Sequence, residues 1–219
     1  EFVSCGIKRE TLLAAGIPVR AVFREQGDRA AARSELALPQ AGQHIVLISG
    51  SIGCGPMADI ASELELRMEK GDFVSVLCGN NRQMLYALRH RGFYRVEAVG
   101  FTNRVQQYMD SADVLVSKPG GISITEACTR GTPLLLADMV GGCETRNQEF
   151  FHAHGWAETC QTEEMANAAM AMLGQPEQRR ELVERQHRDF DGLAADRIAQ
   201  AVCERCRGGA GDDRAAAGV

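Results

Sequence analysis

The chain has 219 residues, of which 45% are hydrophobic and 24% are charged, and its formal net charge is −5. This composition is ordinary for a soluble globular protein with one core. The negative net charge argues against sequence-independent electrostatic binding of nucleic acid. Its apolar runs are too short to cross a bilayer. The chain begins with Glu1 and not with Met, and we expect it to be part of a longer protein.

The sequence divides into three predicted regions. Residues 1–43 hold a helix-like segment at 8–15, the sequence Gly-Ile-Pro-Val at 16–19 and a polar stretch at 24–43, which indicate a lead-in segment and linker. Residues 44–206 alternate short aliphatic runs with longer amphipathic stretches and form the predicted domain. Residues 207–219 are rich in Gly, Ala and Asp, offer almost nothing to bury, and are expected to be disordered.

The alternation in residues 44–206 is typical of an α/β fold with a doubly wound, Rossmann-like parallel sheet and additional C-terminal helices. Strands are predicted at residues 44–49, 73–78, 94–99, 113–117, 133–137 and 155–159. Helices are predicted at residues 57–68, 81–91, 104–110, 121–130, 144–154, 162–173, 176–190 and 193–206.

Cysteines and histidines give no sign of a metal site or of a catalytic triad. The eight cysteines are scattered and are interpreted as reduced; Cys203 and Cys206 form a Cys-x-x-Cys pair, but no second pair or histidine cluster completes a zinc site. None of the five histidines combines with Ser and Asp into a recognisable triad. We therefore expect no metal, and the catalytic residues stay unassigned.

In an open parallel sheet, ligands bind at the loops that follow the strands, next to helix N-termini. The first such loop, residues 49–55, has three glycines and two serines, so its backbone could approach an anion closely; Ser51 and Gly53 are the candidates. Its glycine spacing differs from the dinucleotide fingerprint G-x-G-x-x-G. A merely tight turn is the alternative interpretation.

A second loop, Lys-Pro-Gly-Gly at residues 118–121, ends the predicted strand at 113–117 sharply before a helix begins. The first-turn amides of such a helix are free to point at a phosphate, with the hydroxyls of Ser123 and Thr125 beside them. The loop therefore predicts a diphosphate cradle.

Two further residues, Glu126 and Phe101, are candidates for contacts with a nucleoside. Glu126, about one turn into the helix, could accept hydrogen bonds from two ribose hydroxyls, or could merely complement the helix dipole. Phe101, in the loop at 100–103, offers a ring that suits the face of a base, or could be plain core.

The connection at residues 138–146 is unusually long and carries two glycines and several polar residues. Glu144 and Asn147 could hydrogen-bond the hydroxyls of a sugar as the next helix begins. Alternatively, Glu144 or Thr145 could cap that helix, which is the commoner role for such residues.

These motifs together resemble the lipid glycosyltransferases that include plant monogalactosyldiacylglycerol synthase and bacterial processive diacylglycerol glucosyltransferase. More distantly, they are similar to the enzyme that adds N-acetylglucosamine to a lipid-linked muramyl peptide. The block at 117–127 matches the family pattern K-(A/P)-G-G-x-(S/T)-x-x-E-A, and Gly-Thr-Pro at 131–133 and Glu-Thr-Arg-Asn at 144–147 follow it. The match runs from residue 16 to about 151. Cys143 replaces the usual Gln, and the loop at 49–55 lacks the usual run of adjacent glycines.

The resemblance implies a two-Rossmann-domain transferase of the GT-B type, of which this chain is the C-terminal, UDP-hexose-binding half. It implies inversion without a metal or other cofactor, and a missing N-terminal domain that binds the lipid acceptor and carries the catalytic base. The enzyme would be cytoplasmic and peripheral to the membrane; this half alone would bind UDP, transfer almost nothing, and could self-associate through its terminal helices. By position, Gly120, Gly121 and Ser123 would meet the diphosphate, Glu126 the ribose, Phe101 and Thr102 the uracil, and Glu144 and Asn147 the hexose, with Ser51, Gly53, Pro119 and Thr145 lining the same site.

Two other functions are compatible with the same pattern. A nucleotide-sugar epimerase of the same broad fold would also have glycine loops at strand ends, but would want a catalytic histidine or acid pair near the phosphate loop, and none is found. A non-catalytic nucleotide-sensing or scaffolding module is the other alternative. A preference for UDP over purine nucleotides would favour the transferase.

Overall fold

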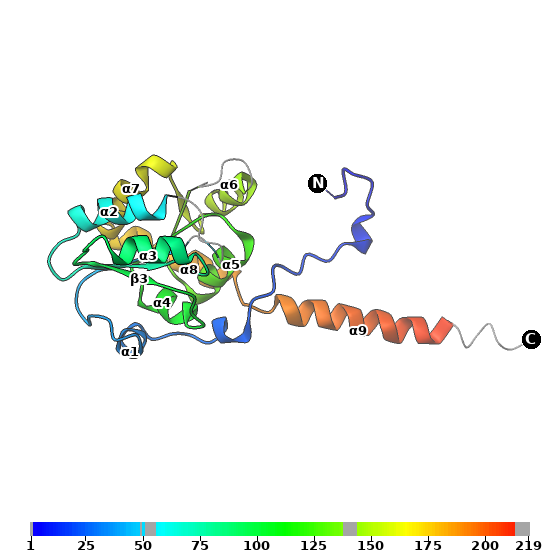
Figure 1. Ribbon diagram of the computed structural model, residues 1–219. Helices are drawn as coiled ribbons and strands as arrows, with labels where there is room; N and C mark the ends of the chain where they lie inside the picture. The colour runs from blue at the N-terminus through cyan, green and yellow to red at the C-terminus, as the bar shows by residue number, and fades with distance from the viewer. Residues whose placement is uncertain (1, 49, 51–55, 138–143, 213–219) are drawn as a thin grey trace, which may run out of the picture.

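The computed structural model describes residues 2–48, 50, 56–137 and 144–212, the last five of these by their backbone alone. One six-stranded parallel sheet forms the centre, with helices on both of its faces (Figure 1). The predicted α/β class and the parallel Rossmann-like sheet are therefore confirmed. The strands are β1 (His44–Ile48), β2 (Phe73–Leu77), β3 (Val96–Val99), β4 (Val114–Ser117), β5 (Leu134–Leu136) and β6 (Glu158–Thr159).

Helices follow the strands almost where the apolar periodicity predicts them. Each observed helix overlaps its predicted range, although several ends differ by one to three residues. The helices of the domain are α2 (Met57–Arg67), α3 (Arg82–Arg89), α4 (Val105–Ser111), α5 (Gly121–Arg130), α6 (Thr145–Ala153), α7 (Met165–Leu173, after the 3-10 turn η3 at Thr162–Glu164) and α8 (Pro176–Asp189). None of the helices within the described ranges is long and apolar enough to span a membrane.

Both faces of the sheet are buried, as the continuous apolar runs in the strands require. Side chains alternate along β1: Ile45 and Leu47 pack with α2, α3 and α7, whereas Val46 and Ile48 pack with α4, α5 and the lead-in segment. The sheet is therefore the middle layer of three.

The order of the strands is β3-β2-β1-β4-β5-β6, so the direction of winding reverses between β1 and β4. These two strands pair with Ile48 opposite Ser117, which brings the loops that follow them side by side. A Cβ atom placed on Gly50 would lie 3.2 Å from Cε of Lys118. In doubly wound sheets, the crevice at such a switch point is the usual ligand site.

The lead-in region differs from its prediction in two ways. The helix-like segment at 8–15 contains only the 3-10 turn η1 (Arg9–Thr11), and a second turn, η2 (Ala21–Phe23), follows. The predicted linker contains helix α1 (Arg29–Glu35), whose Arg33 is only 1% exposed. The sequence gives little sign of this helix, because arginine is usually exposed and because the buried carboxylate that Arg33 contacts, Asp113, lies 80 positions away.

The last helix, α9 (Ala194–Asp212), projects away from the body of the protein, as does the N-terminal segment (Figure 1). It continues six residues beyond the predicted end at Cys206 and so takes in residues 207–212 of the segment expected to be disordered. Extending an existing helix fixes one residue for each hydrogen bond gained, which costs much less than starting a helix.

Candidate functional site

The loop after β4 turns directly into α5 at the crevice between β1 and β4. Gly120 occupies the N-cap position with extended backbone angles, φ −73° and ψ 119°, and makes no side-chain cap. The first amides of any α-helix lack intrahelical acceptors, so this end of α5 can receive an anion. A Cβ atom on Gly121 would lie 3.1 Å from Cδ1 of Ile17, which explains why a glycine fits here.

A pocket of about 250 Å³ opens beside this end of α5. It brings together four residues that the sequence assigns to a nucleotide, namely Phe101, Thr102, Ser123 and Glu126, with Gly50 and Arg20. The lead-in segment, the loops after β1, β2 and β3, and the helices α4 and α5 thus contribute to one cavity at the carboxyl end of the sheet.

Glu126 is the buried acid of this pocket and is only 8% exposed. Burial raises the pKa of its carboxyl group, while the nearby Arg20 guanidinium opposes the shift. The Nε atom of Arg20 lies 3.5 Å from Oε1 of Glu126. Because Glu126 lies in the second turn of α5 and lines a cavity, it is placed for more than complementing the helix dipole.

Phe101 and Thr102 form the opposite wall of the pocket. Phe101 is 66% exposed, so the alternative that it belongs to the core is wrong. The hydroxyl of Thr102 accepts a hydrogen bond from the amide of Arg104 at 3.1 Å, which fixes the loop before α4. The exposed ring is available to a planar ligand.

The start of α6 lies against the loop after β4. Nζ of Lys118 is 2.9 Å and 3.1 Å from the two carboxylate oxygens of Glu144. Nδ2 of Asn147 donates to the carbonyl oxygen of the buried Pro119 at 3.0 Å. Glu144 occupies the N-cap position of α6, but its side chain makes no cap hydrogen bond, and Thr145 is the first helical residue.

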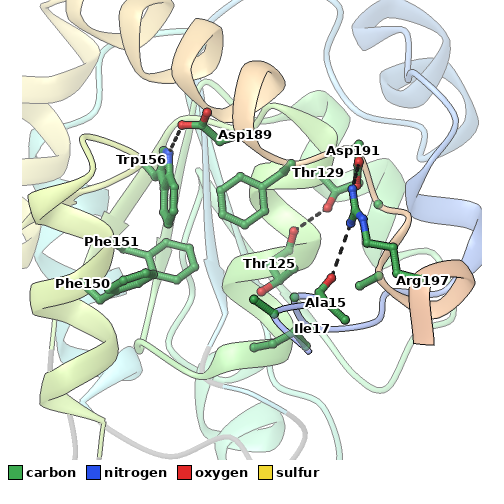
Figure 2. Close-up of a pocket in the computed structure, with 15 residues that line it drawn as sticks. Ala15, Ile17, Thr125, Thr129, Phe150, Phe151, Trp156, Asp189, Asp191 and Arg197 are labelled. Atoms are coloured by element: carbon green, nitrogen blue, oxygen red, sulfur yellow. Dashed lines mark hydrogen bonds and ion pairs between the residues drawn. The ribbon is translucent and has the colours of Figure 1, made fainter. Parts of the chain in front are cut away.

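Thr125 is not where the sequence argument placed it. Two residues along a helix turn the side chain by about 200°, so Thr125 and Ser123 face opposite ways. The Thr125 hydroxyl donates to the carbonyl oxygen of Gly121 at 2.7 Å, and the residue lines a different pocket (Figure 2). It cannot share a phosphate with Ser123.

This second pocket, of about 530 Å³, lies between α5, α6 and the segments that enter and leave the domain. Phe150, Phe151 and Trp156 form one wall, and Figure 2 shows Asp189 turned toward the indole of Trp156. Its polar groups are already engaged: Trp156 donates to Asp189 at 2.7 Å, and Arg197 pairs with Asp191. The lining is mainly apolar and its charged side chains are already paired, so the smaller pocket is the better candidate for a polar ligand.

Two of the predicted residues, Ser51 and Gly53, lie outside the described residues, as does Cys143. Sequence reasoning missed two others, Arg20 and the role of Lys118 as the partner of Glu144. Arg20 follows the Gly-Ile-Pro-Val segment directly and Lys118 opens the glycine loop, so each adjoins a motif, but neither partner is near in sequence. Among the described residues, no cluster of three or more His, Cys, Asp or Glu side chains could hold a metal ion.

Comparisons with known proteins agree with this architecture. The family model "Glycosyl transferases group 1" matches residues 59–189. Over 176 residues the chain is 30% identical to the processive diacylglycerol β-glucosyltransferase of Staphylococcus saprophyticus, an alignment of 79% of this chain and 45% of that protein. The chain thus spans about half the length of the curated relatives it matches.

Solved structures share the fold. MurG of Acinetobacter baumannii superposes with a TM-score of 0.63 at 16% identity, over 83% of this chain and 55% of that one. Alr3699/HepE of Anabaena, in complex with UDP and glucose, superposes with a TM-score of 0.61 at 15% identity, over 92% of this chain and 59% of that one. At such low identity, these likenesses concern the fold alone.

Proposed function

Since the chain belongs to the glycosyl transferases group 1 family, we propose that it is the UDP-hexose-binding half of an enzyme that glycosylates a lipid such as diacylglycerol. The relatives with this name are about twice as long as the aligned region, which leaves room for a second half that holds the acceptor. In the whole enzyme, that half supplies the catalytic base.

One observation carries the proposal: a buried carboxylate, Glu126, lines a pocket that also touches the start of α5 at the switch point of the sheet. The carboxylate accepts hydrogen bonds from the vicinal ribose hydroxyls, and the amides of Gly121 and Ser123 receive the diphosphate, with the Gly120 backbone beside them. Phe101 lies beside the uracil.

The sugar then lies toward the start of α6, next to Glu144 and Asn147. Departure of UDP leaves negative charge on the phosphate, which the α5 amides and helix dipole stabilise without a metal. A hydroxyl of the acceptor attacks from the opposite side, so the configuration at the sugar carbon inverts. This half alone binds UDP and transfers almost no sugar.

The cellular setting follows from the acceptor. A diacylglycerol acceptor lies in a membrane, so the whole enzyme works at the cytoplasmic surface of a bilayer as a peripheral protein. Exposed apolar residues on α9, Ile198 and Val202, support contact with another surface or with a second copy of this half.

Isothermal titration of the 219-residue chain with UDP, ADP and GDP tests the donor assignment. We expect measurable heat of binding for UDP and little for the two purine nucleotides, because the proposed donor carries uracil. Equal affinity for all three, or no affinity for UDP, would overturn the proposal.

A further inference from the structure

Lys118 and Glu144 form an ion pair directly over the glycines of the proposed phosphate site. Their side chains are 26% and 25% exposed, so both charges can be reached from solvent. A Cβ atom on Gly120 would lie 3.4 Å from Oε1 of Glu144 and 3.7 Å from Nζ of Lys118. The pair therefore lies next to Gly120, the N-cap residue of α5.

The side chain of Lys118 is also close to the loop after β1. Cε of Lys118 lies 3.2 Å from a Cβ atom placed on Gly50, whose φ of +77° is accessible mainly to glycine. Lys118 thus passes between the two glycine-containing loops at the switch point. A Cβ atom on Gly50 would crowd the lysine, whereas one on Gly120 would make ordinary van der Waals contact with it.

The two members of the ion pair have opposite effects on an anionic donor. A diphosphate that enters the site brings negative charge to Lys118, which attracts it, and to Glu144, which repels it. The other cation of the pocket, Arg20, faces Glu126 on the ribose side. Lys118 therefore lies on the phosphate side of the crevice, and Arg20 lies on the ribose side.

From this geometry we propose that Lys118 binds the donor diphosphate, and that Glu144 holds the lysine in place until the donor displaces it. When the donor binds, the ammonium group exchanges the carboxylate for phosphate oxygens. Glu144 is then released to accept hydrogen bonds from the hexose hydroxyls. The inference rests on the proposed function, and it makes Glu144 an inhibitor of UDP binding but a contributor to UDP-hexose binding.

The two variants of the pair have opposite expected effects on UDP. Lys118→Met removes the attracting charge, and charge-assisted hydrogen bonds contribute enough that UDP should bind about tenfold more weakly or worse. Glu144→Gln removes the repelling charge and the competitor, so UDP should bind about two- to fivefold more tightly. Uridine has no phosphate, and its affinity should stay the same in both.

UDP-glucose separates the two roles of Glu144. The wild-type chain gains hydrogen bonds between the freed carboxylate and the hexose, whereas Glu144→Gln retains only the weaker bonds of a neutral amide. The ratio of UDP-glucose affinity to UDP affinity should therefore fall in Glu144→Gln. A merely structural ion pair would not change this ratio.

The experiment is titration calorimetry of uridine, UDP and UDP-glucose with the wild-type chain, Lys118→Met, Lys118→Arg and Glu144→Gln. Glu181→Gln is the matched control, because Glu181 and Arg185 form an ion pair of similar length, 3.0 Å, on α8 away from the crevice. Lys118→Arg keeps the positive charge and should retain most of the UDP affinity. Comparison of the two variants therefore separates loss of the charge from a general effect of replacing Lys118.

The outcomes distinguish this inference from the proposed function. If the wild-type chain binds UDP and Lys118→Met binds it equally well, Lys118 has no role at the phosphate and the inference is wrong, while the donor assignment stands. If Glu144→Gln weakens UDP, the exchange between carboxylate and phosphate is wrong. If the wild-type chain fails to bind UDP, the proposed function fails first and this inference with it.

Discussion

Arg20 of the lead-in segment places its Nε atom 3.5 Å from the carboxylate of Glu126 on α5. The same guanidinium lies over the ring of Phe23, 4.9 Å from its centroid, and Phe23 is fully buried. The lead-in segment therefore lines the pocket that holds Glu126 and is anchored to the core next to it. A residue that precedes the sheet by more than twenty positions thus helps to set the charge of the site.

Replacing Glu126 by alanine tests the ribose contact. Hydrogen bonds to a charged group contribute about 1.5–3 kcal/mol each, so we expect UDP to bind Glu126→Ala at least tenfold more weakly in titration calorimetry. The thermal unfolding temperature should change little, because Arg20 is more than half exposed and remains solvated. Glu149→Ala, an exposed acid on α6, is the control. Unchanged UDP affinity in Glu126→Ala would leave Glu126 without a ligand role.

Arg33 should be intolerant even of lysine. Its guanidinium donates to the carbonyl oxygens of Ser111 and Gly42 and to the carboxylate of Asp113, all within 3.4 Å. Lysine has a single nitrogen and cannot reach these acceptors together, and each buried group left unpaired costs about 1–3 kcal/mol. Urea unfolding should show a loss of this size for Arg33→Lys.

Arg29→Lys provides the comparison for Arg33→Lys. Arg29 also pairs with Asp113, at 2.7 Å, but its side chain is 48% exposed. Exposed pairs contribute at most about 1 kcal/mol, so this variant should unfold close to the wild type. Equal losses in the two variants would show that burial of Arg33 does not decide its contribution.

His44 should make the fold sensitive to mild acid. Burial, with the charge of Arg33 as the next cause, lowers the pKa of His44 from 6.5 to about 3. Between pH 6.5 and about pH 3, His44 is therefore protonated in the unfolded chain but neutral in the folded chain. The free energy of unfolding consequently falls as the pH falls below 6.5. Between pH 7 and pH 5 this one residue should cost about 2 kcal/mol of unfolding free energy.

The measurement is urea unfolding at pH 7 and pH 5 for the wild type and for His44→Gln. Glutamine can still bond to the Ser75 and Ser111 hydroxyls that contact the ring, at 2.9 Å and 3.0 Å in the native protein, but it does not titrate. The variant should lose less stability than the wild type over this interval. Parallel losses would assign the acid sensitivity to other groups.

Gly42 and Gly71 form a matched pair of backbone tests. Both have positive φ, +85° and +101°, so any other residue is strained there. A Cβ atom on Gly42 would lie 1.9 Å from the carbonyl oxygen of Gly71, whereas one on Gly71 would have nothing within 4 Å. Gly71→Ala should cost about 1–2 kcal/mol of unfolding free energy, and Gly42→Ala distinctly more, because backbone must move. Similar losses would contradict the crowding at Gly42.

The parts of the fold that were predictable from sequence are those whose signals are local. The strand at 114–117 is a continuous apolar run, and the break at Pro119 and Gly120 and the helix behind it are contiguous with it. The bounds of α5 were predicted without error for the same reason. Phe101, Ser123 and Glu126 meet in one pocket because each follows a strand that ends at the same edge of the sheet.

What the sequence could not predict depends on residues that are distant from one another. Lys118 and Glu144 are 26 positions apart, and nothing in either motif indicates that they pair. Arg33 looks like an exposed residue of a polar linker until Asp113, 80 positions away, is placed beside it. Thr125 is different: helical geometry alone separates it from Ser123, so that error was avoidable.

The segment by which the chain enters the domain contacts the segment by which it leaves. Nη1 of Arg197 donates to the carbonyl oxygen of Ala15 at 3.4 Å, and a Cβ atom on Gly16 would lie 3.5 Å from that of Ala194. The segments at which the chain enters and leaves the domain therefore lie side by side. A short peptide could therefore join those two positions. The domain could then be circularly permuted, or inserted into a surface turn of an unrelated host protein, without distortion of its sheet.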